Sequence, residues 1–306
     1  MKVLLSFVIV ALFAIPVAFS QEPLIGSVSI AGVSIDIAGY TQLTFIENAD
    51  PEFDWPYFRT WQTVKFDDDW KLVMEENFAH MNREEINWLR KFYLERGLNE
   101  NWKIRFGRVV TSAFFSSIPP FKMETISCPL TEPFRSYGYG IQFVGAFENG
   151  WSLLTDITTS SGYSFDNSKS FEYPETSARL TKKFGDNFSL SENIQISEEY
   201  QNFGMDGTWK INNESYLRVA LYRSSNDLRG DSFGGYLFGA YYPAKWLELH
   251  SRLDLGAREG KSSDLIWANG IRLFSFKKNL SLTADVETPL AGDRDCRFLA
   301  RLQFMF

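Results

Sequence analysis

The chain has 306 residues, and its 31 Lys and Arg against 38 Asp and Glu give a net charge of −7 at pH 7. An acidic balance argues against a nucleic-acid partner, for which a basic surface is typical. Aromatic residues are abundant, with 28 Phe, 13 Tyr and 9 Trp, yet there are only two cysteines. A core of the size this chain can form does not by itself account for so many rings, so some are expected on a surface.

The first element is an apolar stretch, MKVLLSFVIVALFAIPVAFS, with one lysine before it and the small-x-small site Ala18, Phe19, Ser20 at its end. This pattern predicts a secretory signal peptide over residues 1–20, with the mature domain over residues 21–306. An uncleaved membrane anchor is the alternative. Both interpretations take the chain out of the cytoplasm.

Polar and apolar residues then alternate strictly in stretches of about ten residues. The clearest are VSIDIAGYTQLTF at 33–45, WLELHSRLDL at 246–255 and LSLTADVETPL at 280–290. A period of two predicts β-strands, and about 9 to 11 residues of tilted strand cross a bilayer. No segment after the signal has 18 consecutive apolar residues, so the closed β-barrel is the spanning structure that remains.

Seven short polar turns punctuate these strands, and an apolar residue follows each turn at once. These residues are Trp70, Trp102, Trp151, Phe188, Tyr216, Trp246 and Leu280. Rings at the same end of every second strand are typical of an aromatic girdle at a membrane boundary. Eight longer connections lie between the short turns. The pattern predicts an all-β, transmembrane antiparallel β-barrel of about 16 strands in the bacterial outer membrane, with 14 or 18 strands, or a soluble all-β protein, as alternatives.

A barrel of about 16 strands leaves an aqueous passage, which predicts a porin for passive diffusion of small hydrophilic solutes or ions. With the apolar face of each strand toward lipid, the cations that face the lumen are Arg59, Lys65, Lys103, Arg105, Arg179, Lys183, Arg218, Arg252, Arg272, Arg297 and Arg301. The acids on that face are Glu75, Asp156, Glu248, Asp254, Asp285 and Glu287. A wall that leans basic would favour anions. Alternatively, the acids and bases pair across neighbouring strands and neutralise one another.

One connection, from Thr111 to Gly138, is far longer than the rest and rich in Phe and Ile. Loops of this length are usually functional or disordered. Burying the apolar side chains of this one in the barrel mouth would narrow the passage. Packing outside, against a neighbouring subunit, is the alternative. Candidate charged residues at the constriction are Lys122, Glu124 and Arg135. Cys128 in this loop can bridge to Cys296 in an oxidising compartment, or both can be free.

The stretches WKIRFGRVVTSAFF and PFRSYGYGIQFVGAFENGWSLLTDITTSSG resemble the middle of the phosphate-selective porin O and P family. In that family a strand that ends in a Gly-Arg or Gly-Lys step, here Gly107-Arg108, leads into the long third loop. The resemblance implies a 16-stranded and trimeric outer-membrane porin with the third loop inside the pore. It does not carry over phosphate selectivity, because the loop has only Lys122 and Arg135 beside Glu124 and Glu132, with no lysine cluster.

Few residues are suited to other chemistry. An embedded hydrolase would need a base beside a nucleophile, and His80 and His250 are the two histidines. No metal-ligand spacing and no glycine-rich phosphate cradle is present, so no cofactor is expected. We therefore expect no enzyme, with a non-conducting adhesin or scaffold, and less readily an embedded hydrolase, as alternative functions.

The chain ends with RFLARLQFMF, in which apolar residues alternate up to the final aromatic. We predict that this is the last strand and that it pairs with the first, because an open sheet edge is not tolerated in lipid. Its arginines would then face the lumen. The terminal Phe306 resembles the signal that the barrel-assembly machinery of the outer membrane recognises.

Overall fold

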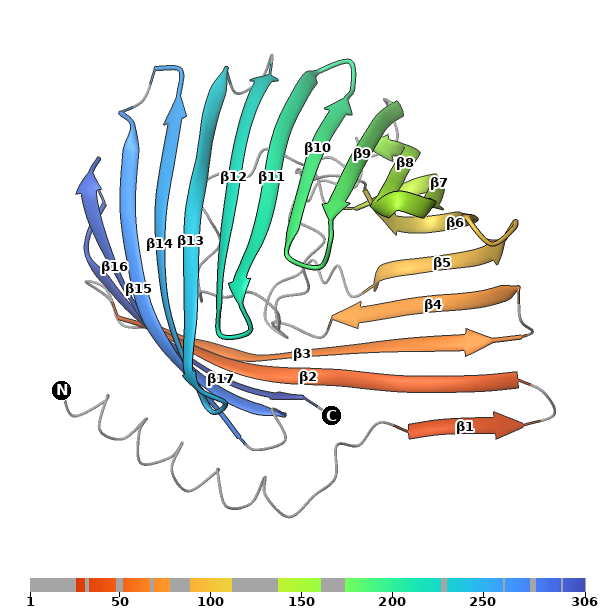
Figure 1. Cartoon of the computed structure of the whole chain (residues 1–306), viewed down its shortest axis with the longest axis horizontal. Coiled ribbons are helices and arrows are strands. Elements are labelled where there is room, and N and C mark those ends of the chain that lie inside the picture. Colours follow the sequence, from red (N-terminus) through yellow and green to blue (C-terminus); the bar gives the residue numbers. More distant parts are fainter. Residues whose placement is uncertain are drawn as a thin grey trace.

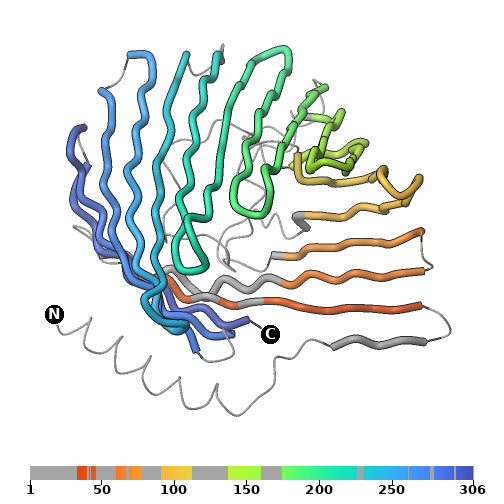
Figure 2. The backbone as a smooth tube through the Cα atoms, viewed as in Figure 1, coloured from red at the N-terminus to blue at the C-terminus, as the bar shows by residue number. Residues whose placement is uncertain are grey.

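The computed structural model describes residues 26–30, 33–47, 52–66, 69–77, 89–111, 137–160, 174–226, 230–260, 262–275, 279–292 and 294–305 (Figures 1 and 2). The strands are β1 (Gly26–Ile30), β2 (Val33–Glu47), β3 (Glu52–Lys65), β4 (Trp70–Asn77), β5 (Leu89–Gly97), β6 (Trp102–Val110), β7 (Tyr137–Ala146), β8 (Trp151–Ser160), β9 (Pro174–Phe184), β10 (Phe188–Ile196), β11 (Tyr200–Asn212), β12 (Ser215–Asn226), β13 (Ser232–Ala244), β14 (Leu247–Arg258), β15 (Asp264–Phe274), β16 (Leu280–Ala291) and β17 (Arg297–Met305). None of the helices in these ranges is long and apolar enough to cross a membrane.

Sixteen of the strands form one closed ring. From β2 to β17 each strand pairs antiparallel with the next one in the sequence. The last strand then pairs with β2, from Phe298 opposite Glu47 to Met305 opposite Tyr40. Figure 1 shows the strands following one another around a single curved wall. The predicted barrel, its strand number and the pairing of its last strand are thereby confirmed.

The sequence did not indicate the short strand β1. It pairs with Val33–Ile37 of β2, at the edge that β17 occupies further along the same strand. Five residues are too few to cross a bilayer, and so few give little periodic signal. The structure therefore has 17 strands in one sheet, of which 16 close the ring.

The seven short turns lie where the sequence places them, each between a pair of strands joined as a hairpin. In the β7–β8 turn, Asn149 and Gly150 have φ values of 65° and 77°. Asn-Gly is favoured where both central residues of a hairpin turn need positive φ. At these turns, Trp70, Trp102, Trp151, Phe188 and Leu280 each begin a strand, which confirms the predicted order of turn and strand.

The two faces of the wall differ sharply in polarity. Large apolar side chains are exposed on the outside, up to 62% for Ile157 and 61% for Leu221. The opposite face buries polar and charged groups, among them Gln142, Asp156 and Glu248, each at most 1% exposed. A protein surrounded by water rarely exposes so large an apolar surface, whereas lipid favours it. The soluble alternative is therefore disfavoured.

Candidate pore wall

The interior face brings together most of the charged residues that the sequence assigned to it. Arg105, Arg179, Arg218, Arg252, Arg272 and Arg301 lie on this face, as do Glu75, Asp156, Glu248, Asp254, Asp285 and Glu287. Lys65, Lys103, Lys183 and Arg297 share the face by register. Arg59 belongs to β3, but its side chain lies outside the described residues.

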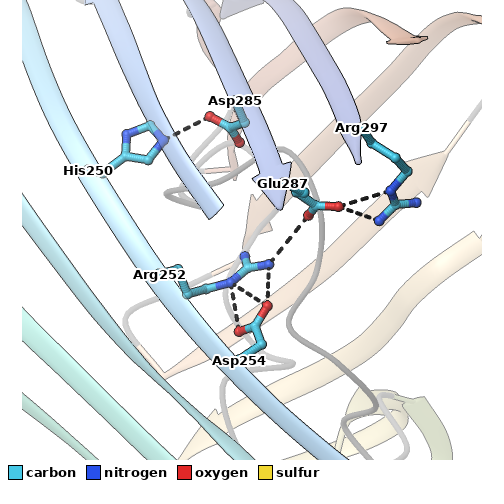
Figure 3. A network of polar contacts seen from close by, with 6 residues as sticks. All are labelled: His250, Arg252, Asp254, Asp285, Glu287 and Arg297. Carbon is cyan, nitrogen blue, oxygen red and sulfur yellow. Dashed lines mark hydrogen bonds and ion pairs between the residues drawn. The ribbon is translucent and has the colours of Figure 1, made fainter. Parts of the chain in front are cut away.

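Strands β14–β17 carry the most densely charged part of the wall, because the register aligns their inward residues in rows. One row holds Glu248, Arg272, Thr283 and Arg301; the next holds His250, Gly270, Asp285 and Leu299; the third holds Arg252, Ala268, Glu287 and Arg297. Figure 3 shows how His250 meets Asp285, and how Arg252, Asp254, Glu287 and Arg297 meet, between the strands. The four arginines of these rows are matched by the three carboxylates of the rows together with Asp254, so this part of the wall neutralises its own charge.

His250 of β14 contacts Asp285 of β16 across the intervening strand β15, at the position of a glycine. Its Nε2 lies 2.8 Å from Oδ1 of Asp285, and its Nδ1 lies 3.1 Å from Oε1 of Glu248. His250 and Asp285 sit on β14 and β16, with Gly270 of β15 in register between them. A Cβ atom on Gly270 would meet both side chains. The missing side chain is thus what allows β14 and β16 to bond across the intervening strand.

Glu287 is the acceptor at the centre of the third row (Figure 3). Its Oε2 accepts a hydrogen bond of 3.0 Å from Nε of Arg297, and its Oε1 lies 3.8 Å from Nη2 of Arg252. Arg252 donates in addition to Asp254, at 2.9 Å and 3.0 Å from Nε to the two carboxylate oxygens. Arg252, Asp254, Glu287 and Arg297 therefore each have a partner of opposite charge.

Replacing Glu287 with Gln is expected to lower the free energy of unfolding by about 1–3 kcal/mol, because two arginines lose a charged acceptor while one hydrogen bond survives. Thermal unfolding of the purified barrel in detergent, followed by circular dichroism, measures this loss. Glu259, an exposed residue after β14, offers the matched Glu→Gln control. Equal stability of the two variants would contradict the role assigned to Glu287.

Strands β6–β11 line the interior with hydrogen-bonded polar groups. Arg105 donates to Gln142 at 2.8 Å, and Gln142 donates to Asp156 at 3.3 Å, which accepts from Ser177 at 2.8 Å. Gln142 and Ser177 are not among the residues that the sequence predicts for the wall. Their inward position in alternating strands was the available signal, but uncharged polar residues are common on either face of a strand.

A second part of this network surrounds Arg179. Arg179 Nη2 donates to Oδ1 of Asp206 at 2.7 Å, and Nη1 donates to Asn193 at 3.0 Å. Asn193 in turn donates to Asp206 at 2.9 Å. Asp206 is thus shared by a base and an amide, and Arg179 is partly neutralised.

Strands β2–β6 form a third region, in which cations outnumber carboxylates. Its ion-paired side chains are Lys65, Lys71, Lys91, Lys103, Arg105, Asp36, Glu75 and Glu95. Glu95 alone lies 2.9 Å from Nζ of Lys71, 3.6 Å from Nζ of Lys103 and 2.7 Å from Nε of Arg105. Its side chain is 3% exposed, whereas that of Lys103 is 52% exposed. We call the inner surface of β2–β6 the basic face, because its most exposed charged side chains, Lys65 and Lys103, are positive.

A closed ring of sixteen strands with an apolar exterior and a charged interior can now be compared with known structures. The fold is that of bacterial porins. The chain is similar to Salmonella typhi OmpF, solved in complex with daunomycin, with a TM-score of 0.71 and 10% identity over 92% of this chain and 100% of that one. It is also similar to an anion-selective porin from Comamonas acidovorans (TM-score 0.65, 11% identity, 90% of this chain and 100% of that one).

Other structures agree with these two. Outer-membrane expressed OmpT of Vibrio cholerae gives a TM-score of 0.64 at 12% identity, over 92% of this chain and 100% of that one. No family model matches the sequence, and no curated protein matches it either. Identities this low establish the porin fold and do not distinguish the phosphate-selective family from other porins.

Several predicted residues lie outside the described residues: Lys122, Glu124, Arg135, Cys128, His80 and Phe306. Cys296 is exposed just before β17 and has no disulfide partner among the residues that the structure describes. The Gly107-Arg108 step does lie at the end of β6, as the resemblance implies. Gly107 has a φ of 124°, which a residue with a side chain rarely adopts.

Proposed function

We propose that this protein is a porin of the bacterial outer membrane, made with a signal peptide over residues 1–20 and forming a water-filled channel for small hydrophilic solutes or ions. The observation that carries the proposal is the inverted polarity of the closed 16-stranded ring. The apolar exterior is stable in contact with lipid, and the charged interior is stable when it is in contact with water and dissolved solutes. The porin fold of the similar structures supports the same conclusion.

Purified folded protein in a planar lipid bilayer is expected to give stepwise, ohmic conductance. Protein boiled in the same detergent is the matched control, since a folded barrel also shifts its migration on a gel when boiled. Conductance from the folded sample alone supports a channel. A closed bilayer with protein that migrates as a folded barrel would contradict it and would favour the adhesin or scaffold.

We further propose that the channel prefers anions, because of the basic face. Glu75 and Glu95 are ion-paired and at most 7% exposed, and Asp36 is 38% exposed beside Lys65, while Lys65 and Lys103 keep 55% and 52% of their side chains exposed. Positive charge at the wall raises the local concentration of anions. In contrast, the charges of β14–β17 neutralise one another and contribute little to selectivity. Charges pair across strands in both regions, as the alternative interpretation holds, but the basic face keeps more cations than carboxylates.

The site also favours passage over catalysis. Both ring nitrogens of His250 contact carboxylates, and its side chain is fully buried. A base held in this way does not have a free nitrogen for a nucleophile. We therefore propose that the protein is not an enzyme, and that His250 stabilises the wall.

Assembly is the last part of the proposal. We propose a homotrimer, as the sequence resemblance implies; one similar structure is described as a trimer form of OmpT from Vibrio cholerae, at 13% identity. We propose also that Phe306 is read by the barrel-assembly machinery during insertion. Lipid of the outer membrane is the surrounding partner.

A further inference from the structure

One carboxylate faces outward from the barrel, in the middle of the apolar exterior. Glu192 is exposed on β10, where its neighbours in register are Leu180 of β9 and Met205 of β11. Across the part of the chain that the structure describes, no hydrogen bond or ion pair reaches this carboxylate. An ionisable side chain that points into lipid is costly, and such residues usually have a partner and a function.

The register fixes the depth of Glu192 along the wall. Four residues toward the short turns, the outward row consists of Phe184, Phe188, Trp209 and Leu217. Four residues toward the long loops, the row consists of Thr176, Ile196, Gln201 and Ser225. The first row is aromatic, as at one membrane boundary, and the second is mainly polar, as at the other. Glu192 lies midway between them, too deep for its short side chain to reach either boundary.

Around Glu192 the exterior is hollowed into a groove of about 530 Å³ across β9–β12. Its outward side chains are Ala178, Leu180, Glu192, Ile194, Phe203, Met205, Leu221 and Arg223. The groove therefore contains one acid, on β10, and one base, on β12, in an otherwise apolar lining. Arg223 is 75% exposed, and its contact with Asp231 is long, 3.8 Å, so its side chain is available to a closer partner.

We propose that this groove is a docking surface for a second copy of this chain, related by a two-fold axis along the membrane normal that passes close to β11. Such an axis sets β11 against the partner's β11, and β10 of each copy against β12 of the other. Glu192 then faces the partner's β12 at Leu221, its neighbour in register, and the partner's Arg223, two residues further toward the long loops, extends its long side chain across that offset to the carboxylate. The same pair forms twice, as a two-fold contact requires. The groove contains both members of that pair, which is the charge complementarity expected of a self-associating surface.

This inference rests on the barrel spanning a bilayer and is independent of the solute that it passes. It concerns a contact between two barrels, and a three-fold assembly through another face remains compatible with it. Lipid filling the groove is the competing occupant. In that case Glu192 and Arg223 would not depend on one another.

Cysteine cross-linking in native membranes tests the contact, in a background with Cys128→Ser and Cys296→Ser. Met205→Cys lies beside the axis, so mild oxidation is expected to give a two-chain band on a non-reducing denaturing gel. Ile157→Cys, on the outside of β8 and more exposed than Met205 (62% against 46%), is the control and is expected to remain a single chain. No more dimer from position 205 than from position 157 would overturn the proposal and would indicate lipid in the groove.

A charge exchange then tests the pairing itself. In the Met205→Cys background, Glu192→Arg and Arg223→Glu are each expected to lower the dimer yield several-fold, and the double variant is expected to restore it. The boiling shift on gels reports the amount of folded barrel in each sample, and Glu192→Gln removes the charge without introducing a cation. Failure of the double variant to recover would overturn the Glu192–Arg223 pair. Conductance is expected to be unchanged throughout, which separates this test from that of the channel.

Discussion

Replacing Lys65 and Lys103 together with glutamine is expected to shift the reversal potential of the channel, measured in a salt gradient, toward cations. These are the two most exposed cations of the basic face. Near a wet surface, each charge contributes roughly 0.5–1 kcal/mol to the local preference for an anion, or about two- to five-fold in permeability ratio. The double variant is therefore expected to lose most of its anion preference.

The salt dependence provides a second signature. Because exposed charges are screened over about 8 Å at physiological ionic strength, the difference between wild type and variant is expected to shrink at 1 M salt. The control is the double variant Arg252→Gln with Asp254→Asn, which removes a buried, mutually neutral pair on β14, outside the basic face. If that control shifts the reversal potential as much as the lysine variant does, the basic face does not set selectivity.

Replacing Gly270 with Ala is expected to destabilise the barrel by about 3–5 kcal/mol, the range found when one member of a buried ion pair is removed. The new methyl group would meet Asp285, His250 and the carbonyl oxygen of Ala284. Both side chains would have to separate inside a wall that gives them little room and little water, since each is at most 1% exposed. Thermal unfolding in detergent measures the change.

Gly207 provides the control for this substitution. It also lies in the middle of a strand, but a Cβ there would meet its nearest atom, the carbonyl oxygen of Ser189, at 3.4 Å. Gly207→Ala is therefore expected to be nearly neutral. Similar unfolding temperatures for the two alanine variants would show that His250 and Asp285 do not depend on the gap at Gly270.

The sequence predicted the barrel well because its two strongest signals come from the bilayer. The alternation of apolar and polar residues, as in Leu247–Leu255, indicates which face of a strand contacts lipid. The aromatic residues after the turns, such as Trp102 and Trp151, indicate the boundary between lipid and water. Both signals are local, and each is repeated along the chain. Strand number and strand order followed from the sequence for this reason.

The interior was harder to predict, because its character depends on which residues become neighbours across strands. Arg105 and Arg252 look alike in the sequence, and both lie on the inner face. Register places Arg105 among cations that share Glu95, whereas Arg252 is bonded to Asp254 and contacts Glu287. Similarly, the link between His250 and Asp285 crosses Gly270, which carries no polar signal at all. Exposure and pairing were therefore visible only in the folded wall.

The closure of the ring has a consequence for how the barrel can form. Every pairing from β2 to β17 joins strands that are consecutive in the chain, and each can arise as a local hairpin. The contact of β17 with β2 is different, because it joins segments near opposite ends of the sequence. The entropic cost of bringing such distant segments together grows only slowly with chain length. We expect this contact to form after the contacts between consecutive strands, because contacts between segments far apart in the sequence form slowly. Until that step, β17 and the Tyr40–Glu47 part of β2 each carry an unpaired edge, so the pairing of β17 decides when the wall becomes continuous.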